Sequence, residues 1–135
     1  MKKLIYGALG LIVLFILAMN SSILADQAVN WVTEHPKDPD APLVLYRAGR
    51  WCNIMGSGDR AVEIYQKLYE MYPERSDLCA PAMYYCAEIK SDSSTVVAIR
   101  KQAIPFLEIV ATQYASEEEW RVKAKKLSDE VNYVH

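Results

Sequence analysis

The sequence predicts an all-α chain that has an apolar helix at its N-terminus and a stack of paired helices after it. From residue 37 onward, apolar residues recur every three or four positions, which is the period of a helix, and no stretch alternates with the period of a strand. Proline and glycine interrupt this pattern at intervals, and the segments between the interruptions resemble one another. The 135 residues leave room for one small domain beside a membrane segment.

The first 25 residues carry only Lys2 and Lys3 as charges, and an uncharged run extends from residue 4 to residue 19. A basic start before an apolar run is typical of a secretory signal, in which Ile23 and Ala25 would precede the cleavage site. It is equally typical of a retained anchor, because residues 4–25 supply about the 20 residues that a membrane-spanning helix needs.

The residues after this segment favour the retained anchor. Apolar residues continue at helical spacing through Ala25 to the proline at residue 36, so cleavage after Ala25 would cut a helix. We therefore expect a transmembrane helix over residues 1–25 and a helical domain over residues 26–135. The positive-inside rule keeps the two lysines in the cytoplasm, which predicts a single-pass protein of the bacterial inner membrane with a periplasmic C-terminal domain. A signal-cleaved, soluble periplasmic protein is the alternative.

Five joints rich in Pro, Gly, Asp or Ser divide the remainder and predict six helices, counting the one that emerges from the membrane. These joints are residues 36–40, 56–59, 72–77, 91–94 and 115–116.

The segments between the joints repeat in pairs about 40 residues apart. Residues 41–49 (APLVLYRAG) recur at 80–88 (APAMYYCAE), and the apolar pattern of residues 61–73 recurs at 103–115. Repeats of this length are helix pairs that stack because one pair alone cannot bury its apolar stripe.

The spacing within the first pair resembles the tetratricopeptide repeat (TPR), in which small residues let two helices approach closely. The matching positions are Leu45, Ala48, Gly49, Cys52, Ala61, Tyr65 and Pro73. The resemblance implies that Gly49 faces Ala61 at the closest approach. The second pair is degenerate, since Glu88 replaces the expected Gly and Ala115 the expected Pro, and Pro105 should kink its second helix.

Single helices are expected to close both ends of the array. Residues 24–36 resemble a lone second helix of the repeat, and a capping box at residues 116–119 (SEEE) opens a final helix that carries Trp120. The predicted architecture is thus a TPR-like α-solenoid of about two repeats between single helices.

The sequence offers no grouping of side chains that suggests catalysis. His35 and His135 have no neighbours at metal or triad spacing, and residues 26–135 are mildly acidic without a long basic run. We therefore expect no catalytic residues, no metal or other cofactor, and no nucleic-acid partner.

The cysteines leave two alternatives, because the predicted compartment permits disulfides. Cys79 and Cys86 lie two turns apart on one predicted helix, which is too far for a bond, so Cys52 with Cys86 is the pair to test. The favoured interpretation is that all three are small buried apolar residues.

The TPR resemblance further implies that the first helix of each pair lines a concave surface, where Tyr and Arg would dominate binding to another protein. The residues expected on this concave face are Tyr46, Arg50, Asn53, Tyr85, Ile89, Arg121 and Lys125. The family's clamp for peptide carboxylates has Lys and Asn where this chain has Tyr46 and Arg50, so a C-terminal peptide is not the expected ligand.

The expected function is that of a non-enzymatic protein–protein interaction module. Through residues 4–25 it would be held in the lipid bilayer and would scaffold or help assemble a larger membrane complex from the periplasmic side. This layout is similar to that of the ancillary TPR subunit of the bacterial protein-export channel. The alternative is a soluble periplasmic chaperone or adaptor.

Overall fold

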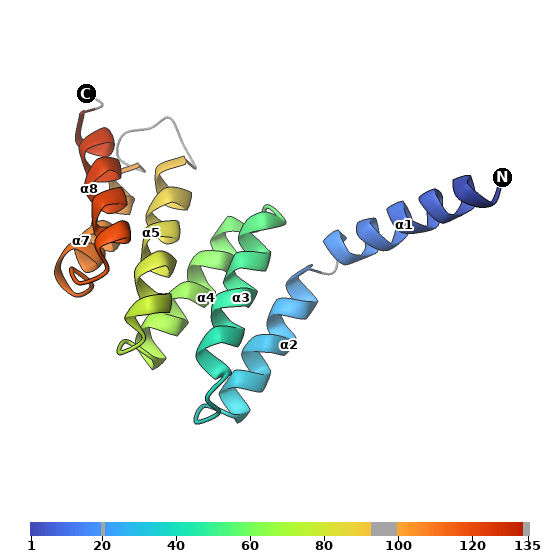
Figure 1. The fold of residues 1–135 in the computed structure, drawn as a ribbon, viewed down its shortest axis with the longest axis horizontal. Helices are drawn as coiled ribbons and strands as arrows, with labels where there is room; N and C mark the ends of the chain where they lie inside the picture. The colour runs from blue at the N-terminus through green and yellow to red at the C-terminus, as the bar shows by residue number, and fades with distance from the viewer. Residues whose placement is uncertain (20, 93–99, 134–135) are drawn as a thin grey trace.

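A computed structural model of the chain describes residues 1–19, 21–92 and 100–133, and within these ranges all regular secondary structure is helical (Figure 1). The predicted all-α class is confirmed. The elements are α1 (Lys2–Met19), α2 (Ser21–Glu34), α3 (Ala41–Ile54), α4 (Gly58–Met71), α5 (Ser76–Asp92), the 3₁₀ helix η1 (Lys101–Ala103), α7 (Ile104–Thr112) and α8 (Glu118–Tyr133).

Three predicted details of the C-terminal half are wrong. Residues 91 and 92 of the joint expected at 91–94 belong to α5, which runs through Asp92; residues 93 and 94 lie outside the described residues. Pro105 does not kink a helix, since it lies in the first turn of α7, where its missing N–H has no intrahelical partner to lose. The proline that the described residues place within a helix is Pro81 of α5.

The predicted capping box is displaced by one residue. The Glu117 carbonyl accepts the first backbone hydrogen bond of α8, from the N–H of Arg121 at 2.9 Å, so Glu117 and not Ser116 holds the N-cap position.

The joint after α3 shows how the sequence sets a sharp reversal. Gly56 has a φ of +82°, a left-handed conformation that glycine adopts without steric cost. The backbone N–H of Gly56 donates to the Asn53 carbonyl at 3.2 Å, and that of Ser57 donates to the Cys52 carbonyl at 2.8 Å. This is the Schellman arrangement, which satisfies the last carbonyls of the helix and lets α4 begin at Gly58.

Each helix from α2 to α8 packs on its neighbours along the chain, and the stack is curved. Besides contacts between sequential elements, α3 contacts α5 directly and α5 contacts α8, whereas contacts among α2, α4 and α7 are sparser. We call α3, α5 and α8 the inner helices and α2, α4 and α7 the outer helices. The inner helices therefore line the concave side of the stack.

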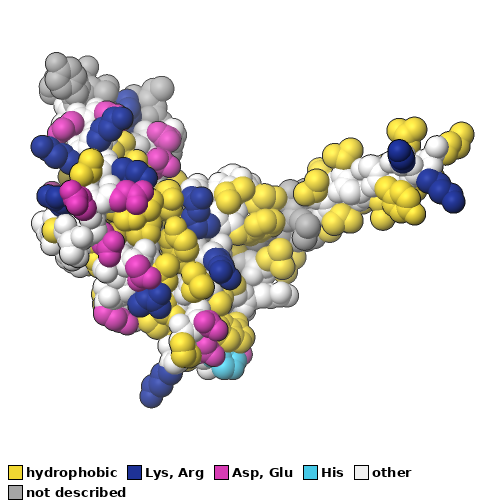
Figure 2. All heavy atoms as spheres, viewed as in Figure 1, with side chains coloured by type: hydrophobic (Ala, Val, Ile, Leu, Met, Phe, Trp, Pro, Cys, Tyr) yellow, Lys and Arg dark blue, Asp and Glu magenta, His cyan; other side chains and the backbone are white. Residues whose placement is uncertain are grey.

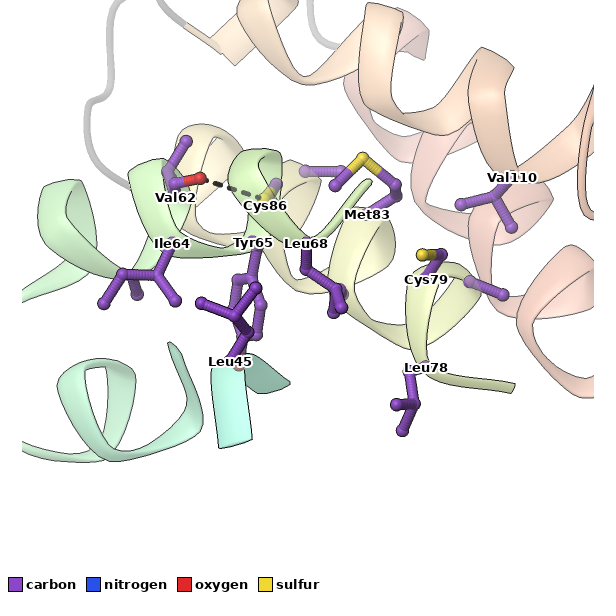
Figure 3. Packing of buried hydrophobic residues seen from close by; sticks show 14 of the residues in the cluster. Leu45, Val62, Ile64, Tyr65, Leu68, Leu78, Cys79, Met83, Cys86 and Val110 are labelled. Atoms are coloured by element: carbon purple, nitrogen blue, oxygen red, sulfur yellow. Dashed lines mark hydrogen bonds between the residues drawn. The ribbon is translucent and has the colours of Figure 1, made fainter. Parts of the chain in front are cut away.

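A continuous apolar core joins the helices (Figure 3). It runs from Leu45 of α3 through Tyr65 and Leu68 of α4 to Met83 of α5 and Val110 of α7, and each of these side chains is buried. Ala25 and Val32 of α2 belong to the same core, so α2 is an integral part of the stack.

The cysteines also lie in this core. Cys52, Cys79 and Cys86 are buried free thiols, which confirms the favoured interpretation, and no disulfide joins Cys52 to Cys86. Burial raises the pKa of all three thiols, so they remain protonated and unreactive at neutral pH.

Two tyrosines make equivalent contacts along the outer side. The Tyr72 hydroxyl at the end of α4 donates to the Pro36 carbonyl after α2 at 2.6 Å. The Tyr114 hydroxyl after α7 donates to the Pro73 carbonyl after α4 at 2.8 Å. The outer helices α4 and α7 are thus each tied at their C-terminal end to the proline that follows the preceding outer helix.

Helix α1 extends away from the stack (Figure 1), and its large apolar side chains from Leu4 to Ile16 have exposed fractions of 49% to 79%. Within the described part of the chain, no helix reaches the length and hydrophobicity needed to cross a membrane. Residue 20, which belongs to the predicted segment 1–25, lies outside the described residues.

Candidate protein-binding face

Aromatic side chains of the inner helices meet a tyrosine of the outer helix α4 in one row, which we call the aromatic row: Tyr46, Tyr65, Tyr84, Tyr85 and Trp120. The Tyr65 ring of α4 lies 6.1 Å from Tyr46 and 6.2 Å from Tyr85, measured between ring centroids. Trp120 of α8 extends the row, since its ring lies 5.6 Å from Tyr85 and 5.7 Å from Tyr84. These separations fall in the range in which aromatic pairs attract one another, so the row is a preorganised surface.

Gly49 makes the centre of the row possible. A Cβ atom at this position would lie 2.5 Å from Cε1 of Tyr65, which is much shorter than any van der Waals contact. The close approach of α3 and α4 at Gly49 is therefore present, but its closest neighbour is the Tyr65 ring and not Ala61, which was predicted. Tyr65 in turn is fully buried and forms the floor beneath Tyr46 and Tyr85.

Cations lie against the row at two places. The guanidinium carbon of Arg50 lies 4.5 Å from the centroid of the Tyr85 ring, and Nζ of Lys123 lies 4.4 Å from that of Trp120. Each contact stabilises the arrangement by about 0.5–1 kcal/mol where it is exposed. These contacts hold the two cations against the rings. The side chains of Arg50 and Lys123 therefore lose less conformational entropy when a partner binds.

Between α5 and α8 the row borders a groove of about 370 Å³. Its lining consists of Tyr84, Tyr85, Glu88, Trp120, Lys123, Lys126, Leu127 and Glu130. Aromatic rings, charges of both signs and one aliphatic side chain together resemble the composition of a protein-binding patch, in which aromatic anchors lie within a polar rim.

The tyrosine hydroxyls of the face stay protonated over the physiological range. Burial is the largest cause that raises the pKa of Tyr46, Tyr65 and Tyr84, and the nearby Glu88 carboxylate raises that of Tyr84 further. The Tyr65 hydroxyl has no hydrogen-bond partner among the described residues. A neutral phenol that packs by its ring and offers one donor is suited to binding and is a poor acid or base at neutral pH.

The structure brings some of the predicted residues together and separates others. Tyr46 and Tyr85 both lie against the Tyr65 ring, and Arg50 lies over the Tyr85 ring, so these three predicted residues are on one face. Asn53 is half-buried on the same helix as Arg50. Ile89 packs against the start of α4, where its Cγ2 atom lies 3.0 Å from the position that a Cβ on Gly58 would take.

Arg121 and Lys125 do not join this face. Both line a separate groove of about 460 Å³ between α7 and α8, together with Leu107 and Ala111 of α7. The expected convergence of these two cations with Tyr85 is therefore not found. Because Trp120 packs on both tyrosines of α5, the next residue in the helix is turned by about 100° toward α7.

The sequence reasoning missed Tyr84, Trp120 and Lys123 as residues of the face. Trp120 and Lys123 lie three residues apart on α8, which places them on one side of the helix. The size of Trp120 was the available signal, since the largest aromatic ring of a closing helix is expected to point at the preceding inner helix and not away from it.

Within the described residues, no group of His, Cys, Asp and Glu side chains has the geometry of a metal site. His35 directly follows α2; its ring stacks on Trp31 with a centroid separation of 5.0 Å, and its Nδ1 lies 2.9 Å from the Trp31 carbonyl oxygen, whereas His135 lies outside the described residues. No family model, curated protein or solved structure matches the chain. The assignment of the face thus depends on its geometry.

Proposed function

We propose that this chain is a non-enzymatic protein-binding subunit whose inner-helix face holds a segment of another protein. The observation that carries the proposal is the aromatic row with Arg50 and Lys123 stacked on it. Tyr, Trp and Arg in a preorganised cluster are the residues that contribute most to binding between proteins. We further propose that the chain scaffolds or assembles a larger membrane complex from the periplasmic side of a bacterial inner membrane.

We infer that the helix pairs α3–α4 and α5–α7 are TPR-like units. Their support is the internal sequence repeat, the division into inner and outer helices, and the equivalent bonds of Tyr72 and Tyr114 to the prolines one unit earlier. A stack with this organisation exposes its inner helices as an extended concave surface, which is how repeat proteins bind their partners.

We also propose that residues 4–25 anchor the protein in the bilayer. The exposed apolar side chains of α1 need a nonaqueous environment, and Lys2 and Lys3 define its cytoplasmic end. Retention of the segment is supported by Ala25, which is 1% exposed and packed in the core beside the proposed cleavage site. Intact-mass measurement on protein from membranes tests this point, and a chain that starts at Asp26 would establish the soluble alternative.

The binding proposal is tested by affinity purification of the full chain from membranes in mild detergent, with mass spectrometry of the recovered proteins. Arg50→Ala combined with Tyr85→Ala should reduce recovery of the partners at least about tenfold, because two such residues in a binding centre contribute about 2 kcal/mol each. The matched control combines Arg121→Ala and Lys125→Ala, which remove two cations from the groove between α7 and α8.

Circular dichroism establishes that both variants are folded. If the folded Arg50/Tyr85 variant recovers the same partners as the parent, the aromatic row is not the binding site. If the Arg121/Lys125 variant loses them instead, the partner occupies the groove between α7 and α8.

A further inference from the structure

We propose that the edge of the domain next to α1, formed by the start of α2 and the end of α3, lies in the interfacial layer of the membrane. This inference rests on the proposed anchor, and it adds which part of the domain contacts lipid and how the stack is oriented. The occupant to which it commits is the boundary between lipid headgroups and acyl chains.

The first observation is an apolar groove of about 380 Å³ between α2 and α3. Leu24 and Ala28 of α2 line one wall, and Val44 and Trp51 of α3 line the other. Arg47 is the only ionisable residue of the lining. A groove of this composition has few groups that can hydrogen-bond to water, so it is suited to aliphatic chains.

The second observation is that exposed aliphatic side chains surround the same end. Ile54, one turn beyond Trp51, is 68% exposed, and Ile23 and Leu24 at the start of α2 are 52% and 43% exposed. The antiparallel packing of α2 on α3 puts the first turn of one helix beside the last turn of the other. In Figure 2, hydrophobic side chains cover α1 and also gather on the part of the domain nearest to it.

Chain continuity argues for lipid as the occupant. Leu24 lies in the groove and follows α1 by five residues, so a bilayer that surrounds α1 is brought to the groove by the chain itself. Trp51 lines the groove with its ring, and Arg47 is exposed at it, where an arginine can pair with a lipid phosphate while its stem stays in an apolar layer. No other partner needs to be invoked to cover this surface.

The orientation that follows is specific. The far end of the domain, at the turn of residues 35–40 between α2 and α3, is then directed away from the membrane. Trp31 lies about 10 Å further along α2 than Leu24, because each residue of a helix adds about 1.5 Å. Trp31 and Trp51 therefore report different depths.

The test uses the full chain in phosphatidylcholine vesicles whose acyl chains are either unmodified or brominated, because bromine quenches nearby indole fluorescence. Trp31→Phe with Trp120→Phe leaves Trp51 as the only tryptophan, and Trp51→Phe with Trp120→Phe leaves Trp31. We expect brominated lipid to quench Trp51 about twofold or more relative to Trp31, since interfacial side chains insert by about 5–10 Å.

A third variant separates this inference from the anchor. Phe15→Trp, with the three native tryptophans replaced by Phe, reports whether α1 is in lipid. If this tryptophan is quenched but Trp51 is quenched no more than Trp31, the edge does not contact the membrane although the anchor does. If the tryptophan at position 15 is also unquenched, the anchor proposal fails as well.

A second measurement avoids replacement of the native tryptophans. Ile54→Cys and Lys37→Cys place a thiol at the two ends of the domain, and both sites are exposed, whereas the native thiols are buried. In phosphatidylcholine vesicles, an environment-sensitive fluorophore at position 54 should emit at shorter wavelength than the same fluorophore at position 37, because position 54 would lie in the interfacial layer and position 37 in water. Equal emission at the two positions would overturn the inference.

Discussion

The inner and outer sides of the stack are held together by different interactions. On the inner side, α3, α5 and α8 approach one another directly and fill the space with the rings of the aromatic row. On the outer side, polar side chains bridge α2, α4 and α7, whose backbones lie further apart. These bridges are Arg60–Asp26, Lys67–Thr33, Tyr69–Gln113, Tyr72–Pro36 and Tyr114–Pro73.

The difference shows what sets the curvature of the stack. Ring packing is short-ranged, so it draws the inner helices together as closely as their side chains allow. Hydrogen bonds at fixed distances span the wider outer gap and define its width. Stability is therefore expected to reside mainly on the inner side, while the outer side specifies the angle between units.

The largest effect is expected at Gly49, where the inner packing has no spare volume. Gly49→Leu should lower the free energy of unfolding by about 3 kcal/mol, because the Tyr65 ring occupies the place of the new side chain and is itself fully buried. Urea-induced unfolding of the full chain in mild detergent measures the change. Gly10→Leu in α1 is the control, since apart from its own helix backbone and its two chain neighbours nothing in the described residues lies within 4 Å of the position that its Cβ would take. Equal stability of the two variants would contradict the tight fit.

The all-α class and most of the helix positions were predictable from the sequence, for a physical reason. Apolar spacing marks the helices, and a glycine such as Gly56, which takes a left-handed conformation, marks a joint. The position of Pro105 shows the limit of this reasoning. Whether a proline starts a helix or interrupts it depends on where the helix begins, and here α7 begins at Ile104, one residue before Pro105 and directly after η1.

The candidate site was predictable only in part. Tyr46, Arg50 and Tyr85 followed from the register of the repeat, which is strong in the first pair. The rotation of α8 did not, because it is determined by the contact of Trp120 with Tyr84 and Tyr85 across 35 or more residues of chain. An error of one residue turns a helix by about 100°, which was enough to assign Arg121 in place of Trp120.

The next prediction compares tyrosine hydroxyls on the two sides. Tyr72→Phe and Tyr114→Phe should each lower the free energy of unfolding by about 1 kcal/mol, because each removes a hydrogen bond to a proline carbonyl. Tyr65→Phe should leave stability unchanged or raise it, since the Tyr65 hydroxyl is buried without a partner. Urea-induced unfolding of the parent and the three variants measures these changes; a loss at Tyr65 as large as that at Tyr72 would show that the inner side also depends on a hydroxyl bond.

The smallest effect is expected at the bridge between Asp26 of α2 and Arg60 of α4. Their side chains are 56% and 34% exposed, so solvent screens the pair, and Arg60 keeps a second partner in Glu63 at 2.8 Å when Asp26 is changed. Asp26→Asn should therefore lower the free energy of unfolding by about 0.2–1 kcal/mol, and about 1 M NaCl should remove most of that difference. A double-mutant cycle with Arg60→Gln isolates the pair from the other contacts of each residue. Should the coupling exceed this range and persist in salt, the outer side would contribute to stability as well as to angle, and the contrast between the two sides would not hold at the N-terminal end of the stack.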